Sequence, residues 1–124
     1  MPITPWKEGY MLAVIFEVIP TKEGKSVYLQ IAAELRKFLE NRDGFISIER
    51  FQSLTEEGKI LSLSFWRDES AIEEWRNILE HRMTQTKGKE FLFHSYRIRV
   101  AKVIRDYTKT DRAQAPSDSG KALA

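Results

Sequence analysis

The stretch of residues 60–85, ILSLSFWRDESAIEEWRNILEHRMTQ, constrains the fold of this chain more than any other. Its first seven residues alternate leucine and phenylalanine with serine and tryptophan, which is the period of a strand with two different faces. Asp68 then offers a helix N-cap, and the helix that it opens carries Trp75 inward. A strand therefore passes directly into a helix, which brings Trp66, Trp75 and the imidazole of His81 close together.

Three other runs have the composition of strands. Residues 10–19, YMLAVIFEVI, are almost continuously apolar and predict a strand that is buried on both faces. Residues 45–54, FISIERFQSL, precede a polar loop with a late glycine and predict a hairpin with the strand at residues 60–66. Residues 96–104, YRIRVAKVI, contain alternating basic residues and predict a long last strand.

Two segments between these strands have the pattern of helices. Thr21 is a predicted N-cap for a helix that extends to about Glu40 and presents one apolar stripe. In the second segment, the spacing of Asn77 and Glu80 fits a capping box, which predicts a break and a further helix over residues 78–90. The resulting order of elements is β-α-β-β-α-β.

This order predicts an α+β fold, the ferredoxin-like split β-α-β arrangement, in which a four-stranded antiparallel sheet carries its helices on one face. The other face would expose Leu61, Leu63 and Phe65. Because an exposed apolar patch of this kind usually marks an interface, we expect a homodimer that packs sheet against sheet into a barrel-like core.

Length and composition narrow the class of protein. The 124 residues suit one domain, here expected over residues 10–107, with a flexible lead at residues 1–9 and a polar tail at residues 108–124. The absence of cysteine excludes disulfides and thiol chemistry. No apolar run is long enough to cross a bilayer, so a cytoplasmic protein without membrane contact is expected. The net charge of +2 comes from mixed charges without a basic face, which argues against nucleic-acid binding.

Several of these segments resemble the antibiotic biosynthesis monooxygenase (ABM) family of the dimeric α+β barrel superfamily. The resemblance lies in the order of elements, the PTKEG turn, the FWRDESAIEEWRN junction and the EHRMTQ segment, and it covers residues 10–106. It implies a small-molecule monooxygenase that oxidises an aromatic or quinol-type substrate without a cofactor, in a pocket between helices and sheet. The haem-degrading branch of the family is a poorer match, because its Asn, Trp and His positions hold Phe16, Trp75 and Gln85 here.

Cofactor-free oxidation needs a dry apolar pocket, a base and donors for a developing oxyanion. His81 is the candidate base because of its ordinary pKa range, and Arg82 and Gln85 are the candidate donors. The candidate substrate-binding residues are the aromatic side chains Phe16, Tyr28, Phe51, Trp66 and Trp75. The sequence holds no metal-ligand constellation, and no cofactor is expected.

Structural roles compete with each of these assignments. Trp75 at helical spacing, and Trp66 at a strand end, could be core residues. His81 could face solvent, and the basic residues of the last strand could be interface or solvent charges. At the level of function, the alternative is a non-catalytic dimeric ligand-binding or stress-related protein of the same fold, and isomerase or lyase chemistry stays open.

Overall fold

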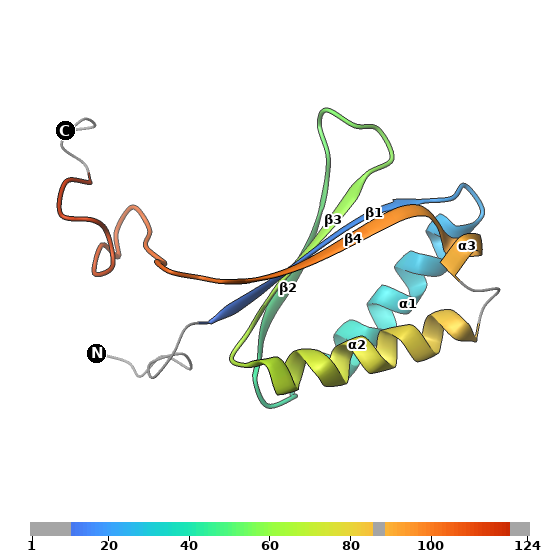
Figure 1. Cartoon of the computed structure of the whole chain (residues 1–124), viewed down its shortest axis with the longest axis horizontal. Helices are drawn as coiled ribbons and strands as arrows, with labels where there is room; N and C mark the ends of the chain where they lie inside the picture. Colours follow the sequence, from blue (N-terminus) through green and yellow to red (C-terminus); the bar gives the residue numbers. More distant parts are fainter. Residues whose placement is uncertain (1–10, 86–88, 120–124) are drawn as a thin grey trace.

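The structure, a computed structural model, describes residues 11–85 and 89–119 and consists of one sheet backed by helices (Figure 1). The elements in chain order are β1 (Leu12–Pro20), α1 (Gly24–Leu39), β2 (Phe45–Gln52), β3 (Ile60–Trp66), α2 (Glu69–Thr84), α3 (Lys89–Leu92) and β4 (Phe93–Lys102). This order confirms the predicted β-α-β-β-α-β sequence and adds the short α3. Among the described residues, no helix combines the length and apolar character that a membrane span requires.

The four strands form one antiparallel sheet in the order β2-β3-β1-β4. β1 is central and pairs with β3 on one side and with β4 on the other. α1 and α2 lie on one side of the sheet, which leaves the opposite side bare (Figure 1). The predicted α+β, ferredoxin-like fold is therefore confirmed.

The two faces of the sheet differ in burial. On β1, Val14, Phe16 and Val18 are buried under the helices, whereas Ile15 and Glu17 on the other face are half-buried. In the single chain the helices bury one face of this strand, and on the other face Ala13 is buried while Ile15 and Glu17 are not fully covered, so burial of the whole second face by another subunit stays a prediction. The predicted open-face residues, Leu61, Leu63 and Phe65, are likewise half-buried, while the intervening Ser62 and Ser64 are buried on the helix side.

Thr21 makes a capping hydrogen bond to α1, although the N-cap residue of this helix is Glu23 and not Thr21 as predicted. Its hydroxyl accepts a hydrogen bond from the Gly24 N–H at 2.8 Å and donates one to the Phe91 carbonyl. Its backbone N–H donates to the Leu92 carbonyl at 2.9 Å. One threonine therefore caps the first turn of α1 and holds it against α3, which is 70 residues away in the sequence.

α2 begins where the sequence predicted but shows no break. The Asp68 carboxylate accepts a hydrogen bond from the Ala71 N–H at 3.1 Å, which confirms it as the N-cap. The predicted break at Asn77 was wrong, because α2 is continuous from Glu69 to Thr84. Trp75, Leu79 and Met83 are buried at intervals of four residues, so one apolar stripe passes the predicted break without interruption.

We expect the Asp68 cap to make stability depend on pH. Hydrogen bonds from the Ala71 backbone N–H and the Ser70 hydroxyl, with the Arg67 guanidinium nearby, lower the pKa of the Asp68 carboxyl. A lowered pKa contributes stability above the unfolded value, about 3.9, and that stability is lost as the pH falls through the folded value. Asp68→Ala should lower the free energy of unfolding at pH 7 by about 1 kcal/mol.

Asp68→Asn removes the carboxylate charge but keeps the capping hydrogen bond, because the Asn amide oxygen can still accept from the Ala71 N–H. In urea titrations between pH 7 and pH 3, Asp68→Asn should lose less stability than the wild type as the solution is acidified. An identical loss in both proteins would show that Asp68 does not contribute to the acid dependence.

Beyond β4 the chain leaves the body of the molecule. Residues 103–119 run away from the helices in Figure 1, and the Val103 N–H donates to the Met11 carbonyl at 2.9 Å. Further on, the Arg112 guanidinium lies 4.9 Å from the centre of the Tyr107 ring. The lead predicted for residues 1–9 lies outside the described residues, so its flexibility stays a prediction, as does that of the tail.

Candidate functional site

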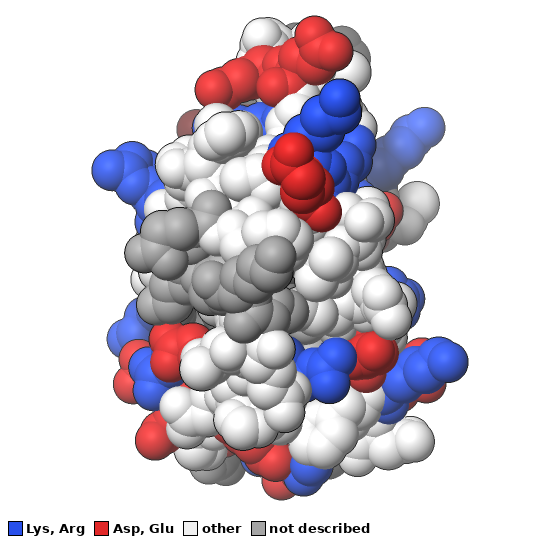
Figure 2. Space-filling view, turned by 90° about the vertical axis from the view of Figure 1, so that its right-hand side faces the viewer, with Lys and Arg blue, Asp and Glu red and all other residues white. Residues whose placement is uncertain are grey.

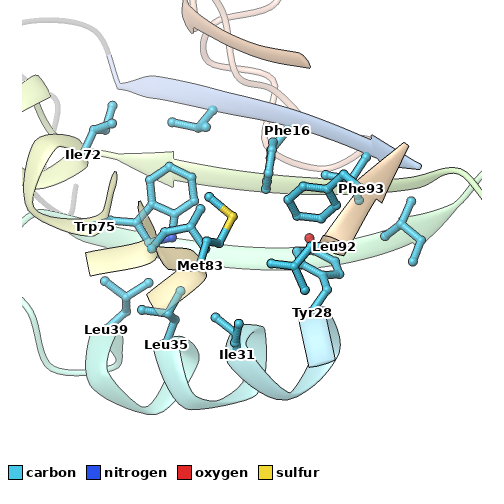
Figure 3. Packing of buried hydrophobic residues seen from close by; sticks show 14 of the residues in the cluster. Phe16, Tyr28, Ile31, Leu35, Leu39, Ile72, Trp75, Met83, Leu92 and Phe93 are labelled. Atoms are coloured by element: carbon cyan, nitrogen blue, oxygen red, sulfur yellow. The ribbon is translucent and has the colours of Figure 1, made fainter. Parts of the chain in front are cut away.

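An aromatic layer fills the space between the helices and the sheet, with Phe16 of β1 at its centre. The Phe16 ring meets four other rings edge-on, at centroid distances of 6.4 Å to Tyr28, 6.3 Å to Trp75, 6.2 Å to Phe93 and 6.0 Å to Tyr96. Figure 3 shows Phe16 pointing from β1 toward the helices, between Trp75 and Phe93. Edge-to-face contacts of this kind add to the stabilisation from apolar burial.

The two tryptophans of the strand and helix junction belong to this core. Their ring centroids lie 5.9 Å apart, and Trp66 and Trp75 are 1% and 4% exposed. The Trp66 indole N–H donates to the Ser64 hydroxyl at 2.8 Å, so its polar atom is satisfied inside the core. Both indoles are enclosed by protein side chains rather than by an open space, which favours the core role that competed with ligand binding.

Tyr28 of α1 brings an unusual polar group into the layer. The side chain is 2% exposed, and its hydroxyl has no hydrogen-bond partner within the described part of the chain. Burial raises the pKa of Tyr28, while the nearby Arg50 guanidinium lowers it in part. The phenol is therefore neutral at pH 7, because its ordinary pKa is already about 10.

An apolar ledge extends the aromatic layer to the edge of the sheet. We use the name β4 ledge for Tyr96, Ile98 and Val100, which pair with the buried Val18, Phe16 and Val14 of β1 and so point to the helix side. The ledge residues are nevertheless 41%, 39% and 47% exposed. β4 is an edge strand: α1 packs on β1 and α2 packs on β3, whereas β4 meets the short α3.

A hollow of about 580 Å³ lies at one end of the β4 ledge, between β4 and the first turn of α2. Its lining combines apolar and charged side chains: Leu12, Arg67, Asp68, Glu69, Val100, Ala101 and Lys102. At the other end of the ledge, the Tyr96 ring contacts both Phe16 and Phe93, at 6.0 Å and 5.8 Å. The ledge is therefore an accessible apolar surface with an aromatic wall at one end and a charged hollow at the other.

The end of the molecule that carries α3 has charged side chains of both signs around it (Figure 2). Figure 2 shows this end, with acidic side chains gathered at the edge where the hairpin between β2 and β3 lies. Glu56 and Glu57 are exposed in that hairpin. Acidic and basic side chains also lie across the lower part of this view, so this end is not a uniformly apolar surface.

The predicted catalytic residues lie apart from the aromatic layer. His81 is exposed on α2, and its backbone carbonyl accepts from the Gln85 N–H at 3.1 Å. Arg82 forms an ion pair with Glu34 of α1, and Gln85 is the exposed C-cap of α2. Four of the five predicted substrate-binding residues do meet in the aromatic layer, namely Phe16, Tyr28, Trp66 and Trp75. The fifth, Phe51, is 42% exposed and lines a hollow with Glu17 and Lys59.

The described residues show no cluster of metal-ligand side chains and no match to the Asn of the haem-degrading pattern. Within those ranges, no three His, Cys, Asp or Glu side chains come together in a group that could hold a metal ion. The position where the haem-degrading pattern asks for Asn holds Phe16, whose ring is buried among the aromatic side chains. These residues do not fit the haem-degrading pattern.

Comparisons with known proteins agree with this architecture. The family model described as "Antibiotic biosynthesis monooxygenase" matches residues 11–87. A protein of Pyricularia oryzae named "Jasmonate monooxygenase ABM" is 47% identical over 93 residues, which are 75% of this chain but 43% of that protein. A Bacillus subtilis protein named "Uncharacterized protein YqjZ" is 31% identical over 93 residues, 75% of this chain and 79% of that protein. The chain thus spans less than half the length of the Pyricularia relative.

Solved structures share the fold at low sequence identity. Rv0793 of Mycobacterium tuberculosis superimposes with a TM-score of 0.65 at 18% identity, over 79% of this chain and 99% of that one. SnoaB of Streptomyces nogalater, described as a cofactor-independent oxygenase, gives a TM-score of 0.60 at 10% identity, over 79% of this chain and 97% of that one. Together with the family match over more than half of its residues, these findings show that the chain belongs to the antibiotic biosynthesis monooxygenase family.

Proposed function

We propose that this protein is a small-molecule monooxygenase that binds an apolar, aromatic or quinol-type substrate on the β4 ledge. The observation that carries the proposal is the exposure of Tyr96, Ile98 and Val100 on the helix side of the sheet, where their partners on β1 are buried. Partly exposed apolar side chains beside an aromatic core offer a ligand surface that water solvates poorly. Family membership supplies the reaction class.

The reaction can proceed without a cofactor if the substrate supplies the electrons. For a methylene group activated by neighbouring aromatic rings, loss of a proton gives a carbanion that passes an electron to dioxygen. The methylene then becomes a carbonyl with one oxygen atom, and the second oxygen atom leaves as water, so the atoms and electrons balance. SnoaB, which shares the fold, is described as a cofactor-independent oxygenase, and this supports the proposal.

The apolar β4 ledge and the name of one relative together indicate the class of substrate. The relative named for jasmonate indicates that a family member can act on a small apolar acid, so jasmonate belongs in the test panel beside quinols and polyphenols. The alternative is a ligand-binding protein of the same fold without catalysis. Oxygen uptake during incubation with the panel distinguishes the two, because only the enzyme consumes oxygen above the uncatalysed rate.

We further propose that the protein works as a homodimer through the bare face of the sheet. Leu61, Leu63 and Phe65 lie on this face and are half-buried in the single chain. Glu17, on the same face, lies 3.3 Å from the Arg99 guanidinium and 3.8 Å from the Lys59 ammonium group. A second copy would cover the apolar side chains and find compensated charges beside them.

Ile98→Asp tests the β4 ledge. Because the carboxylate would have to lose water when an apolar ligand binds, we expect ligand affinity to fall at least about tenfold, with a matching loss of oxygen uptake. The matched control is Lys37→Gln, which also lowers the net charge by one, at an exposed position on α1 away from β4, and should leave both quantities unchanged. Tryptophan fluorescence titration and an oxygen electrode measure the two effects, and equal behaviour of both variants would contradict ligand binding on the ledge.

The catalytic role of His81 stays a prediction, and the exposed place of its side chain favours the competing role of a solvent-facing residue. We therefore expect His81→Ala to change the free energy of unfolding by no more than about half a kcal/mol and to keep turnover within about twofold. Steady-state oxygen uptake measures this. A fall in turnover of about two to four orders of magnitude with unchanged affinity would instead identify His81 as the general base.

A further inference from the structure

A second hollow lies at the opposite edge of the sheet from the β4 ledge. It has a volume of about 270 Å³ and opens between the first turns of α1 and the edge strand β2. Its lining combines two cations with apolar side chains: Lys25 and Leu29 from α1, Arg50, Phe51 and Gln52 from β2, and Ile60 from β3. The volume is below the usual range for drug-sized ligands, so a molecule of a few carbon atoms would suit it.

Arg50 is only half-exposed and lacks a counter-ion. Its Nε atom is buried and has no hydrogen-bond partner among the described residues. Within the same part of the chain, neither Arg50 nor Lys25 takes part in an ion pair with a carboxylate. A partly desolvated guanidinium without a negative partner is costly, which makes an external anion favourable at this position.

Tyr28 lies close to Arg50 but cannot supply the missing charge. Its side chain is 2% exposed, its hydroxyl is unpartnered within the described residues, and burial raises its pKa despite the opposing effect of Arg50. The phenol is therefore neutral at physiological pH, so the hollow has two positive charges and no negative one in its described lining. Neither the buried Nε nor the buried phenol makes a hydrogen bond of normal geometry within the described chain, although the Arg50 guanidinium is close enough to the phenol to interact with it and lower its pKa in part.

We propose that this hollow binds a small organic carboxylate with an apolar body. The planar fork of Arg50 matches a carboxylate in two parallel hydrogen bonds, and Lys25 adds a second positive charge at the rim. Leu29 and Phe51 would cover the apolar body, a role that a bare phosphate or sulfate ion would leave unused. The site is separate from the proposed oxygenase site, because β2 and β4 are the two opposite edges of the sheet.

Isothermal titration of the full chain with hexanoate tests this site. Hexanoate should bind, while hexanol, which has the same carbon chain without the charge, should bind at least about tenfold more weakly. Arg50→Gln should reduce hexanoate affinity by about ten- to a hundredfold, and Lys25→Gln by a smaller factor. The matched control is Lys37→Gln, which removes a charge from an exposed position further along α1 and should leave affinity unchanged.

Thermal melts without ligand check that each variant is folded, and Lys25→Gln keeps the test decisive if Arg50→Gln unfolds, because Lys25 is exposed. Three results would overturn the proposal: no binding of hexanoate at millimolar concentration, equal binding of hexanoate and sulfate, or equal loss in Lys25→Gln and Lys37→Gln. If Arg50→Gln loses hexanoate binding but keeps the oxygen uptake of the wild type, this site is independent of the proposed oxygenase site.

Discussion

Replacing Leu63 by glutamate is expected to convert the protein from a dimer to a folded monomer. Leu63 lies at the middle of the bare sheet face and is half-buried in the single chain, so a carboxylate there can still reach water in the monomer. In a dimer it would be desolvated without a partner, at a cost of several kcal/mol, which corresponds to an increase of about a hundredfold or more in the dissociation constant. Sedimentation velocity at micromolar concentration measures the change.

Gln30→Glu is the control for Leu63→Glu, because it adds the same charge on the exposed side of α1. This variant should keep the mass of the wild type. A monomeric wild type with a cooperative thermal melt would contradict the dimer, and so would a Leu63→Glu variant that keeps the mass of a dimer.

Gly24→Ala is expected to destabilise the junction between α1 and α3. A Cβ atom at Gly24 would lie 2.6 Å from the Cα and the carbonyl oxygen of Leu92 and 2.6 Å from the Thr21 hydroxyl. Since the obstacle is largely backbone, α1 must shift and weaken the hydrogen bonds from Thr21 to the Phe91 and Leu92 carbonyls. Overpacking and the lost bonds together should lower the free energy of unfolding by about 2 to 3 kcal/mol in urea titrations.

Ser26→Ala separates this steric effect from helix propensity. Ser26 is exposed two residues further along α1, where alanine is a slightly better helix former. This control should therefore be neutral or slightly stabilising. A Gly24→Ala variant as stable as the wild type would show that α1 and α3 can separate at little cost.

The fold was readable from the sequence because each strand and helix carried its own period and boundary signal. Thr21 and Asp68 were recognised as capping residues from local chemistry, and both side chains accept backbone hydrogen bonds in the first turn of a helix, although only Asp68 is the N-cap residue itself. The predicted break at Asn77 was wrong because the solvent face of a continuous helix can also hold an Asn followed by a Glu three residues later. The stripe of Trp75, Leu79 and Met83 decides between the two, since it continues across the position.

The candidate site was only partly readable, because it depends on which strand lies at the edge. In residues 96–104, basic side chains alternate with apolar ones, and a role was predicted only for the basic ones. The apolar residues of the same strand, Tyr96, Ile98 and Val100, form the β4 ledge. Only the strand order shows that the helices leave these positions uncovered. The same limit applies to Tyr28 and Arg50, which lie 22 positions apart in the sequence and meet across α1 and β2.

The roles of the two tryptophans could not be separated by residue type. Trp66 ends a strand above two serines, a pattern that suits either a ligand or a core. The structure shows that the Ser64 hydroxyl accepts from the Trp66 indole N–H, which satisfies the one polar atom of the ring and permits full burial. This contact could not be predicted from the sequence, because it depends on the rotamers of both side chains.

The most direct test of the central claim is the origin of the oxygen atom in the product. The purified protein, without added cofactor, is incubated under ¹⁸O₂ with the members of the panel that bind it, and the products are analysed by mass spectrometry. If the protein is a monooxygenase acting on the β4 ledge, the wild type and Lys37→Gln will form a product with one ¹⁸O atom, and Ile98→Asp will form much less. Bound compounds recovered without ¹⁸O, or equal labelling by Ile98→Asp, would contradict this function.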